Sequence, residues 1–276
     1  MKTLSKQEVL NFQQKIYDYY KQHRRSFAWR EGISPYRIVV SEIMLQQTQT
    51  SRVIHKFSEW IRNFPNFDIL AKSSKQQVLS CWQGLGYNRR GLALHEFAKK
   101  IIHEYKGMVP ADQETLQTFK GIGPNTAGSI CAFAYNKPVV FIETNIRTVF
   151  MYEFFKHEEK VHDKDLLPLI KQAVDHKNAR EWYYALMDYG VHLKTKLKVS
   201  NKKSKHYIKQ SQFEGSKRQM RGAVVRVLSK MHTLSYDELS ELVTLDIPGN
   251  KHDLLSVVED LQKDGVLKYA KDIISF

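Results

Sequence analysis

The sequence has little cysteine and no long apolar segment. Its two cysteines, Cys81 and Cys131, stand beside apolar or aromatic residues, which is typical of buried thiols in a reducing compartment. By themselves they cannot hold an iron–sulfur cluster or a structural zinc site, so we expect no metal and no cofactor. The apolar runs fall far short of the roughly 20 residues that cross a bilayer. We therefore expect no membrane span. The first residues mix charged and apolar side chains, so we also expect no signal peptide. These expectations together indicate a cytoplasmic protein, which in a prokaryote would be associated with the nucleoid.

Acidic side chains are scarce relative to basic ones. The 276 residues include 43 lysines and arginines but 29 aspartates and glutamates, which gives a formal net charge of +14. Such an excess points to a polyanionic partner, either nucleic acid or an anionic membrane. The strongest basic stretch, from Lys194 to Arg221, lacks the apolar face of an interfacial helix, which favours nucleic acid. A solvated surface is the alternative interpretation of such a run.

Helical spacing of apolar residues dominates the chain up to about residue 193. Short segments rich in glycine and proline separate the helical stretches, as in all-α proteins with short connections. We therefore predict an all-α fold. The predicted helices are 6–20, 36–47, 52–64, 75–82, 90–105, 114–119, 126–135, 145–155, 164–175 and 179–193.

The pattern changes near Ser200, where a polar, lysine-rich linker begins. After Gly215 we predict three short helices, followed by two strand-like segments that are able to pair as a hairpin. Three helices and a hairpin describe a small winged-helix-like module. Such a module would either bind DNA or only pack against its own protein, and the sequence leaves both open. The predicted helices are 221–231, 235–243 and 253–263, and the strands are 265–269 and 273–276.

The strongest local motif runs from Leu116 to Ala127. A short helix ends in a Gly-Ile-Gly turn, and Pro124 then stands where the next helix should open. Two helices joined this way present free backbone amides and a positive helix N-terminus, which suit a DNA phosphate. A plain structural connection between two helices is the alternative. The phosphate-binding interpretation assigns contacts to Gly121, Ile122, Gly123 and Thr126.

An acidic residue, Glu143, ends the apolar run that follows this hairpin. By itself it fits a first-turn residue favoured by the helix dipole. A hairpin followed at this spacing by a proline-containing loop and an acid resembles the helix-hairpin-helix (HhH-GPD) superfamily of DNA glycosylases, which includes endonuclease III and the MutY-type adenine glycosylases. Further segments resemble MutY-type motifs in matching order over roughly residues 8–193. They are Ala28-Trp29-Arg30, Pro35-Tyr36-Arg37, Ser41 to Gln49, Trp82 to Tyr87, and Ala185 to Gly190.

The resemblance implies a fold with two helical lobes. Residues 1–30 and 144–200 would form one lobe, and residues 31–143 a six-helix lobe that includes the helix-hairpin-helix 112–135. A basic linker, 201–215, and the winged-helix-like module, 216–276, would follow. The target base would be flipped out of the duplex, because its glycosidic bond cannot be reached in the stack.

Two carboxyl groups carry the chemistry that the resemblance implies. Glu42 corresponds to the general acid that protonates the leaving adenine, and Glu143 stands where the family has its catalytic aspartate. Loss of the base builds positive charge on the sugar, so one carboxyl must hold a proton while the other is ionised. The positions implied for the base pocket and for the wedge into the duplex are Trp29, Arg30, Gln47, Thr48, Tyr87, Asn125 and Asn145.

The sequence departs from the family pattern at several points. Glu143 is one methylene longer than aspartate. Asn125 stands where bifunctional relatives carry a lysine, so strand cleavage through a Schiff base should be weak or absent. The segment that begins at Lys194 has none of the four cysteines that hold the family's iron–sulfur cluster. Its lysines would replace the cluster region in facing the DNA phosphates. We also expect the usual C-terminal domain that inspects oxidised guanine to be absent.

The combined prediction is a monofunctional, cofactor-free DNA N-glycosylase of base excision repair. It would act as a monomer on double-stranded DNA that contains a damaged or mispaired base. Adenine opposite 8-oxoguanine or guanine is the first expected substrate. A mispaired or modified pyrimidine is the second, because Glu143 and Asn125 both alter the pocket. A catalytically inactive protein that recognises DNA by shape is the third alternative.

Overall fold

The computed structural model describes residues 2–205 and 212–276. The chain divides into two compact units. The first unit comprises Met1–Glu42, Pro110–Thr118 and Ile122–Lys209, and the second comprises Ile43–Val109, Phe119–Gly121 and Gln210–Phe276. The lobe and linker boundaries expected from the sequence remain a prediction. Residues 206–211 of the expected linker lie outside the described residues.

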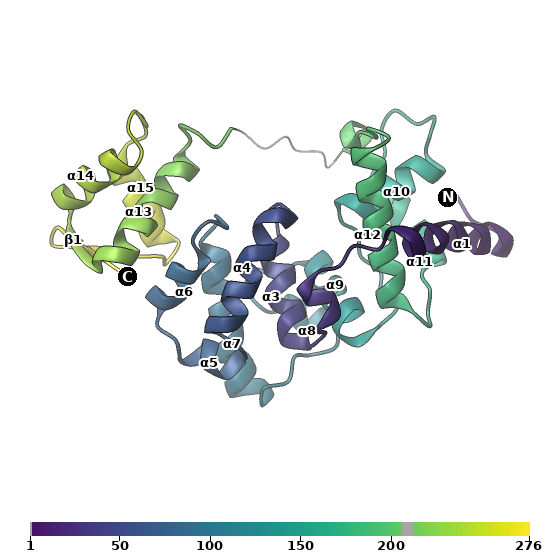
Figure 1. The fold of residues 1–276 in the computed structure, drawn as a ribbon, viewed down its shortest axis with the longest axis horizontal. Helices are drawn as coiled ribbons and strands as arrows, with labels where there is room; N and C mark the ends of the chain where they lie inside the picture. Colours follow the sequence, from purple (N-terminus) through teal and green to yellow (C-terminus); the bar gives the residue numbers. More distant parts are fainter. Residues whose placement is uncertain (1, 206–211) are drawn as a thin grey trace. The chain divides into compact units, whose positions relative to one another are not determined.

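The first unit is helical, as the apolar spacing predicts. Its N-terminal helix begins at a capping box, in which Ser5 and Glu8 exchange side-chain to backbone hydrogen bonds. The unit contains α1 (Lys6–His23), α2 (Ala28–Glu31), most of α3 (Pro35–Leu45), α8 (Gln113–Gln117), α9 (Pro124–Tyr135), α10 (Thr144–Phe154), α11 (Asp163–Ala173), α12 (Ala179–Thr195) and the 3₁₀ turn η1 (Asn201–Lys203) (Figure 1).

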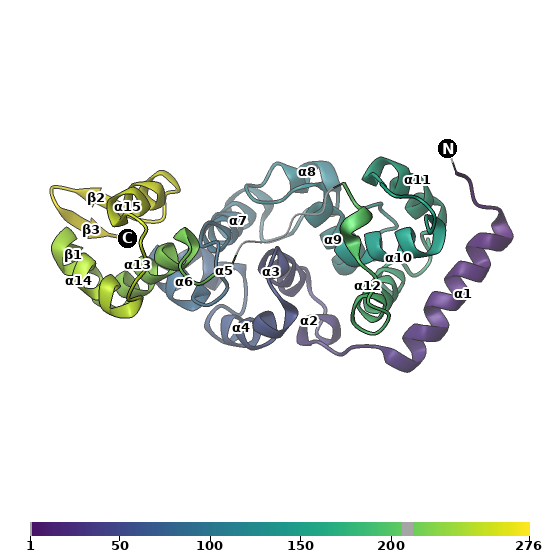
Figure 2. The ribbon, with the colours of Figure 1, turned by 90° about the horizontal axis from the view of Figure 1, so that it is seen from above.

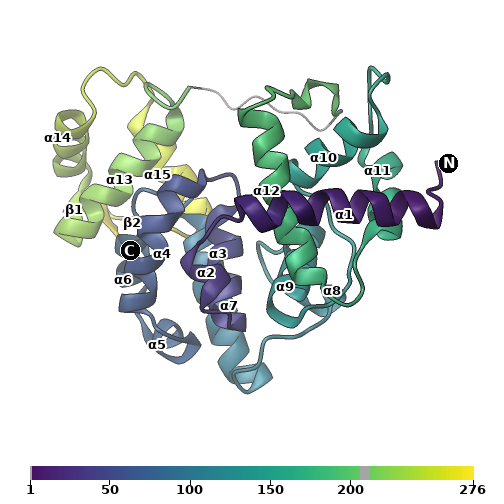
Figure 3. The ribbon, with the colours of Figure 1, turned by 45° about the vertical axis from the view of Figure 1, so that its right-hand side comes forward.

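Helix α12 is the centre of the first unit and packs against α1, α9 and α10 (Figure 2, Figure 3). An aromatic cluster fills the space between these helices, with the Phe12 ring 5.3 Å from Phe150 and 5.6 Å from Trp182, centroid to centroid. Gly190 lets α12 approach the first turn of α10 closely, because a Cβ there would lie 2.5 Å from the Asn145 carbonyl oxygen. The close packing fixes the position of the start of α10, which follows Glu143.

The second unit contains the remaining helices and a small sheet. Trp60 and Trp82 form part of its core, with their rings 5.4 Å apart. Gly91 lies against Trp82, where a Cβ would come within 2.9 Å of the indole. Its elements are α4 (Thr50–Asn63), α5 (Phe67–Lys72), α6 (Lys75–Trp82), α7 (Arg89–Tyr105), α13 (Lys217–Met231), β1 (Thr233–Ser235), α14 (Tyr236–Asp246), α15 (Leu254–Lys263), β2 (Lys268–Ala270) and β3 (Ile273–Ser275).

Residues 216–276, hereafter the C-terminal module, have three helices and a three-stranded antiparallel sheet in the order β1-β3-β2 (Figure 2). Strands β2 and β3 pair with Tyr269 opposite Ile274, which confirms the predicted hairpin and the winged-helix-like module. Strand β1 was not predicted, because Leu234 is its only apolar residue and Ser235 was assigned to the helix that follows. The prediction of an all-α fold is confirmed. Over the described ranges 2–205 and 212–276, no helix has the length and apolar character needed to span a membrane.

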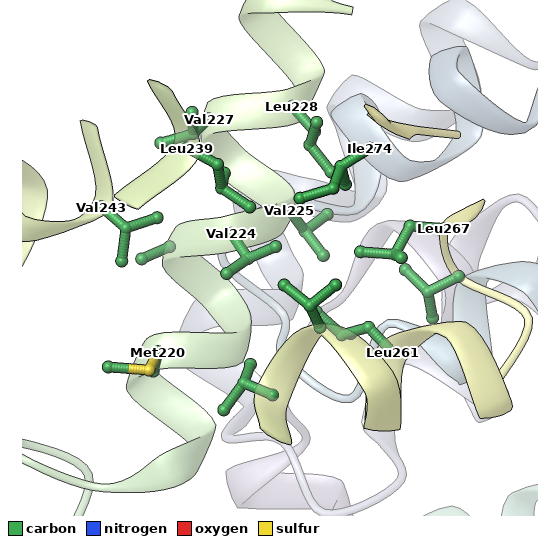
Figure 4. Packing of buried hydrophobic residues seen from close by; sticks show 14 of the residues in the cluster. Met220, Val224, Val225, Val227, Leu228, Leu239, Val243, Leu261, Leu267 and Ile274 are labelled. Carbon is green, nitrogen blue, oxygen red and sulfur yellow. The ribbon is translucent and has the colours of Figure 1, made fainter. Parts of the chain in front are cut away.

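A dense apolar core holds the C-terminal module together (Figure 4). Val224 and Leu228 of α13, Leu261 of α15 and Ile274 of β3 are fully buried in it. Leu79 of α6, from outside the module, is also fully buried in this core. The module is therefore anchored on α6 by shared apolar burial.

Candidate active site

Glu42 lies in the apolar helix α3, next to the buried residues Ile43 and Met44. It is partly buried, and its removal from water raises the pKa of Glu42 to about 7. A hydrogen bond with Ser129 opposes this shift, the negative charge of Glu143 adds to it, and the positive charge of Arg30 opposes it. A large fraction of the Glu42 carboxyls therefore holds a proton near neutral pH.

Glu143 is the N-cap of α10 and has an extended backbone. Its Oε1 accepts hydrogen bonds from the backbone amides of Asn145, at 2.7 Å, and Ile146, at 2.9 Å. Its Oε2 accepts one from the Asn145 side-chain amide at 3.1 Å. These three donors fix the orientation of the carboxylate. The Asn145 Oδ1 atom is buried without a hydrogen-bond partner in the described part of the chain, so it can accept one from a ligand.

A buried ion pair between Arg30 of α2 and Asp188 of α12 lies in the same unit. The two side chains are 2% and 1% exposed, and the guanidinium donates to both carboxylate oxygens at 2.9 and 3.0 Å. The Arg30 guanidinium also lies 4.3 Å from the ring centroid of Tyr184. Trp29 is buried and stacks on Phe27 at 4.8 Å. Arg30 is thus held rigidly near Glu42, while Trp29 packs in the interior.

The helix-hairpin-helix turn has one position that requires glycine. Gly121 has a φ of 83°, in the left-handed region, whereas Gly123 has a φ of −91° and serves as the N-cap of α9. No side chain caps α9, so amides of its first turn point outward without an intrahelical acceptor. Ile122 is buried and anchors the turn. Asn125 accepts a hydrogen bond from the Ile142 amide at 3.2 Å, which ties the start of α9 to the loop before Glu143.

Gln47 and Tyr87 lie in two loops of the second unit, and both have left-handed backbones with φ of 54° and 48°. Side chains rarely adopt this conformation, and surrounding contacts must hold it. The guanidinium of Arg90, which is 8% exposed, supplies those contacts, and burial lowers the pKa of Arg90 to about 10. It donates to the carbonyl oxygens of Ile43, Met44, Gln46, Leu85 and Gly86 at 2.6 to 3.1 Å and to Thr48 Oγ1 at 2.9 Å.

The sequence-predicted site residues fall into two groups, one in each unit. The first unit brings together the two carboxyl groups, the proposed base pocket and most of the hairpin, and the second unit brings together the predicted wedge residues. The first group contains Trp29, Arg30, Glu42, Ile122, Gly123, Asn125, Thr126, Glu143 and Asn145. The second contains Gln47, Thr48, Tyr87 and Gly121.

Sequence reasoning missed several residues that interact with these two groups. Asp188 belongs to a motif but received no role, and Ser129 gave no signal in the sequence. Lys194 lies one turn after Gly190 on α12; burial lowers its pKa, and the negative charge of Glu143 raises it. The burial of Arg90 was predictable from the sequence, because Arg90 lies one turn before Leu94 on the apolar face of its helix.

The chain after α12 does not fit an iron–sulfur cluster, which would need four thiolates. The whole sequence has two cysteines, and neither lies in this segment. Instead, Asn201 accepts a hydrogen bond from Thr148 Oγ1 at 2.7 Å and donates one to the Thr144 carbonyl at 3.3 Å. Val161 and Ser204 form a parallel bridge. Among residues 2–205 and 212–276, no group of three or more His, Cys, Asp or Glu is placed to hold a metal ion.

Two curated proteins that the chain resembles are adenine DNA glycosylases. An adenine DNA glycosylase of Mycobacterium tuberculosis H37Rv is 42% identical over 132 residues, which are 48% of this chain and 43% of that protein. One from Buchnera aphidicola (Baizongia pistaciae) is 32% identical over 184 residues, which are 66% of this chain and 52% of that protein. The chain thus spans about half the length of these curated relatives.

Solved structures agree in fold. A thermostable thymine-DNA glycosylase is 25% identical with a TM-score of 0.58, and the match covers 66% of this chain and 85% of that one. A non-covalent endonuclease III–DNA complex gives a TM-score of 0.60 at 13% identity, over 73% of this chain and 97% of that one, which shows a likeness of fold alone. The family model described as HhH-GPD superfamily base excision DNA repair protein matches residues 40–175. Residues 40–175 of this chain are therefore a domain of the HhH-GPD superfamily.

Proposed function

We propose that the protein is a monofunctional DNA glycosylase that hydrolyses the N-glycosidic bond of a flipped adenine opposite 8-oxoguanine or guanine. The observation that carries this proposal is the pair formed by Glu42 and Glu143. The pKa of Glu42 is raised to about 7, and three hydrogen-bond donors hold the carboxylate of Glu143. Depurination needs one protonated and one ionised carboxyl.

Glu42 acts as the general acid. It donates its proton to a ring nitrogen of the adenine, which then leaves as a neutral base when the bond to C1′ breaks. Arg30 and Asp188 form an ion pair with 2.9 Å between a guanidinium nitrogen and a carboxylate oxygen. The pair presents fixed polar groups near Glu42. The unpartnered Oδ1 of Asn145 supplies a hydrogen-bond acceptor. These groups would orient the base before proton transfer.

Glu143 stabilises the positive charge that develops on the deoxyribose as the base leaves. Its carboxylate is oriented in advance, so it need not reorganise during the reaction. Water then adds to C1′ and gives up a proton, which restores the protonated form of Glu42, and an abasic site remains. Glutamate keeps the charge of the family's aspartate, and its backbone hydrogen bonds as N-cap of α10 hold the longer side chain in place.

The relatives support adenine as the leaving base. Each of the two proteins compared above is an adenine DNA glycosylase, and the model of a base excision repair family matches residues 40–175 of this chain. The excess of basic residues supports double-stranded DNA as the partner. We expect the protein to act on it as a monomer.

A second candidate is a glycosylase for a mispaired or modified pyrimidine. It is favoured by the structural likeness to a thymine-DNA glycosylase at 25% identity. Asn125 also departs from the family pattern, and its side chain accepts a hydrogen bond from the Ile142 amide.

Strand cleavage is expected to be weak, because no amine occupies position 125. The lysine that interacts electrostatically with Glu143 is Lys194, whose pKa is lowered by burial. Borohydride trapping of the protein on abasic DNA measures any Schiff base. If a trapped complex forms, its loss in Lys194→Ala would assign the amine.

We also propose that the protein works without an iron–sulfur cluster. Two cysteines cannot supply four thiolates, and hydrogen bonds of Asn201 hold the segment where the family has its cluster. Iron content and visible absorption of anaerobically purified protein test this proposal. Stoichiometric iron with a cluster absorption band would contradict it.

The decisive experiment is single-turnover base release from duplexes with adenine opposite 8-oxoguanine, guanine or thymine, with alkali added to cut at abasic sites. We expect release from the first two duplexes. Glu42→Gln and Glu143→Gln should each lower the rate by at least about a hundredfold. The matched control is Glu158→Gln, an exposed carboxyl outside the site, which should leave the rate unchanged.

Two outcomes would replace the proposal. Release of thymine, uracil or a modified cytosine with adenine untouched would favour the second candidate. Salt-sensitive DNA binding without release of any base, at enzyme in excess, would identify an inactive protein that recognises DNA by shape.

A further inference from the structure

A short turn after α12 presents Asn201 to the start of α10. Residues 200–205, hereafter the tether, contain the 3₁₀ turn η1, which packs against α10. Ser200 caps this turn by accepting a hydrogen bond from the Lys202 amide at 3.2 Å, and the Ser204 amide closes it on the Asn201 carbonyl at 2.9 Å. Serine and asparagine favour such turns, because their short side chains bond to nearby backbone groups.

Backbone pairing anchors the other end of the tether. The Val161 amide donates to the Lys203 carbonyl at 3.0 Å, and the Lys205 amide donates to the Val161 carbonyl at 3.2 Å. Val161 lies between α10 and α11 and is 2% exposed, so little water competes for these bonds. Asn201 is therefore presented to α10 from a support that has hydrogen bonds of its own.

Asn201 makes two polar contacts with the first two turns of α10. Its Oδ1 accepts a hydrogen bond from Thr148 Oγ1 at 2.7 Å, and its Nδ2 donates to the Thr144 carbonyl at 3.3 Å. The Thr148 hydroxyl also lies 2.7 Å from the Thr144 carbonyl, so its one hydrogen is shared between two acceptors. Thr148 is fully buried, where such bonds are stronger than in water. Asn201, Thr144 and Thr148 thus form a closed polar triangle.

This triangle holds the helical turn that orients Glu143. Thr144 directly follows Glu143, and the next two amides, those of Asn145 and Ile146, donate to Glu143 Oε1. The first turn of a helix frays readily unless its groups are held from outside. Fraying here would move both donors and the carboxylate together. A displacement of about 1 Å at a reacting group can lower a rate by about a hundredfold.

We propose that Asn201 is a positioning residue for base release, which keeps the Glu143 carboxylate in its working orientation by holding Thr144 and Thr148 at the start of α10. The inference rests on the proposed function, because the reaction that it refers to is the base release proposed above. In this role Asn201 acts through Glu143 and makes no contact with the substrate. The segment after α12 thus contributes to the rate of the reaction as well as to folding.

Three variants and a matched control test the triangle. Asn201→Ala removes both contacts, and Thr148→Val removes the hydroxyl with little change in side-chain volume. Thr148→Ser keeps the hydroxyl and should restore the behaviour of the unmodified protein. The control, Asn250→Ala, removes a half-buried asparagine of the other unit, whose amide donates to the Ser216 carbonyl at 3.3 Å and to Gln219 Oε1 at 3.1 Å. Thermal unfolding checks that each variant is folded.

Amide hydrogen exchange, followed by NMR, reports the geometry without any reaction. The Asn145 and Ile146 amides donate to Glu143, so they should exchange at least about tenfold faster when the triangle is broken by Asn201→Ala. The control variant should leave both exchange rates unchanged. Unchanged exchange in Asn201→Ala would overturn the inference.

Single-turnover rates of base release test the effect on the reaction. We expect Asn201→Ala and Thr148→Val to lower the rate about tenfold, and the control to leave it unchanged. The dissociation constant for an undamaged duplex should stay within about twofold, because Asn201 carries no charge that neutralises a phosphate. In Glu143→Gln protein, Asn201→Ala should leave the residual rate unchanged, because the group through which it acts has already been altered.

Two results of these rate measurements would overturn the inference. One is an equal loss of rate with and without Glu143→Gln, and the other is weaker DNA binding at an unchanged rate. Either would mean that Asn201 acts by a route other than Glu143.

The two readouts also separate this inference from the proposed function. Faster exchange in Asn201→Ala, in a protein that releases no base from any duplex, leaves the hold of Asn201 on Glu143 standing and rejects the proposed function. Base release and exchange that Asn201→Ala both leaves unchanged reject the positioning role, and the proposed function stands.

Discussion

Glu42 owes its chemistry to its burial. Removal from water disfavours the charged carboxylate and raises the pKa of Glu42 to about 7. Glu143 adds a negative charge that acts in the same direction. The surroundings of Glu42 thus favour its protonated form near neutral pH.

The pH dependence of base release follows from this pKa. The Glu42 pKa is raised to about 7, so the protonated acid predominates below pH 7 and is lost as the pH rises through 7. We expect the single-turnover rate to fall about tenfold per pH unit above pH 7. Rates measured between pH 5.5 and 9 check this. A rate that rises through pH 7 would contradict the role as an acid.

At the residue scale, the resemblance of motifs singled out Glu42, Glu143, Arg30 and Asn145, and their roles remain predictions. Their partners were not predictable. Ser129 and Asp188 come from helices far along the chain, and only tertiary packing brings them next to Glu42 and Arg30. The lowered pKa of Lys194 likewise depends on burial that no local pattern reveals.

Among the elements, the two loops that carry Gln47 and Tyr87 depend on one side chain. Arg90 donates six hydrogen bonds to them and to the end of α3, at 2.6 to 3.1 Å. Since both loops hold strained backbones, the arginine stabilises a geometry that the local sequence disfavours.

Replacement of Arg90 by methionine tests this dependence. The variant leaves buried carbonyl oxygens without donors, at about 1 to 3 kcal/mol for each unsatisfied group, so we expect stability to fall by about 3 kcal/mol or more. Urea unfolding measures the change. Arg89→Met, at the exposed neighbouring position, should stay within about 0.5 kcal/mol of the unmodified protein. Similar stability of the two variants would show that the loops keep their conformation without the hydrogen bonds of Arg90.

Long helices were predicted well and short elements poorly. Apolar periodicity located α7 and α12, whose 17 residues span several turns. Helices α2 and α5 have four and six residues, too few to establish a period, and they form because neighbouring packing stabilises them. The hairpin turn was correctly located, but only Gly121 of its two glycines has positive φ.

On the scale of the whole molecule, the net charge of +14 favours binding to a polyanion, which in the proposed function is DNA. Each phosphate that a protein neutralises releases counterions, so affinity depends on salt.

Salt dependence is therefore a direct prediction. If about six phosphates are neutralised, log K should fall against log salt concentration with a slope of about −5. Titrations of an undamaged duplex between 50 and 300 mM salt measure it, with circular dichroism as a control that the fold persists. A slope near zero would mean that the excess of basic residues serves another purpose than DNA binding.

The order of the parts along the chain was predicted, but the attachment of the C-terminal module was not. Leu79 looks in the sequence like an ordinary apolar residue of a short helix. Its burial in the core of the C-terminal module depends on chain segments about 150 residues apart in sequence. Such long-range pairings leave no periodic signal.

The reaction rates of the two buried cysteines can report local opening of the protein. Cys131 belongs to the first unit and Cys81 to the second, and burial raises the pKa of each thiol to about 11. At neutral pH a thiol-specific reagent therefore reacts with either residue only when its surroundings open. Labelling rates at the two positions, resolved by mass spectrometry, would report separately how often each unit opens, without any engineered label.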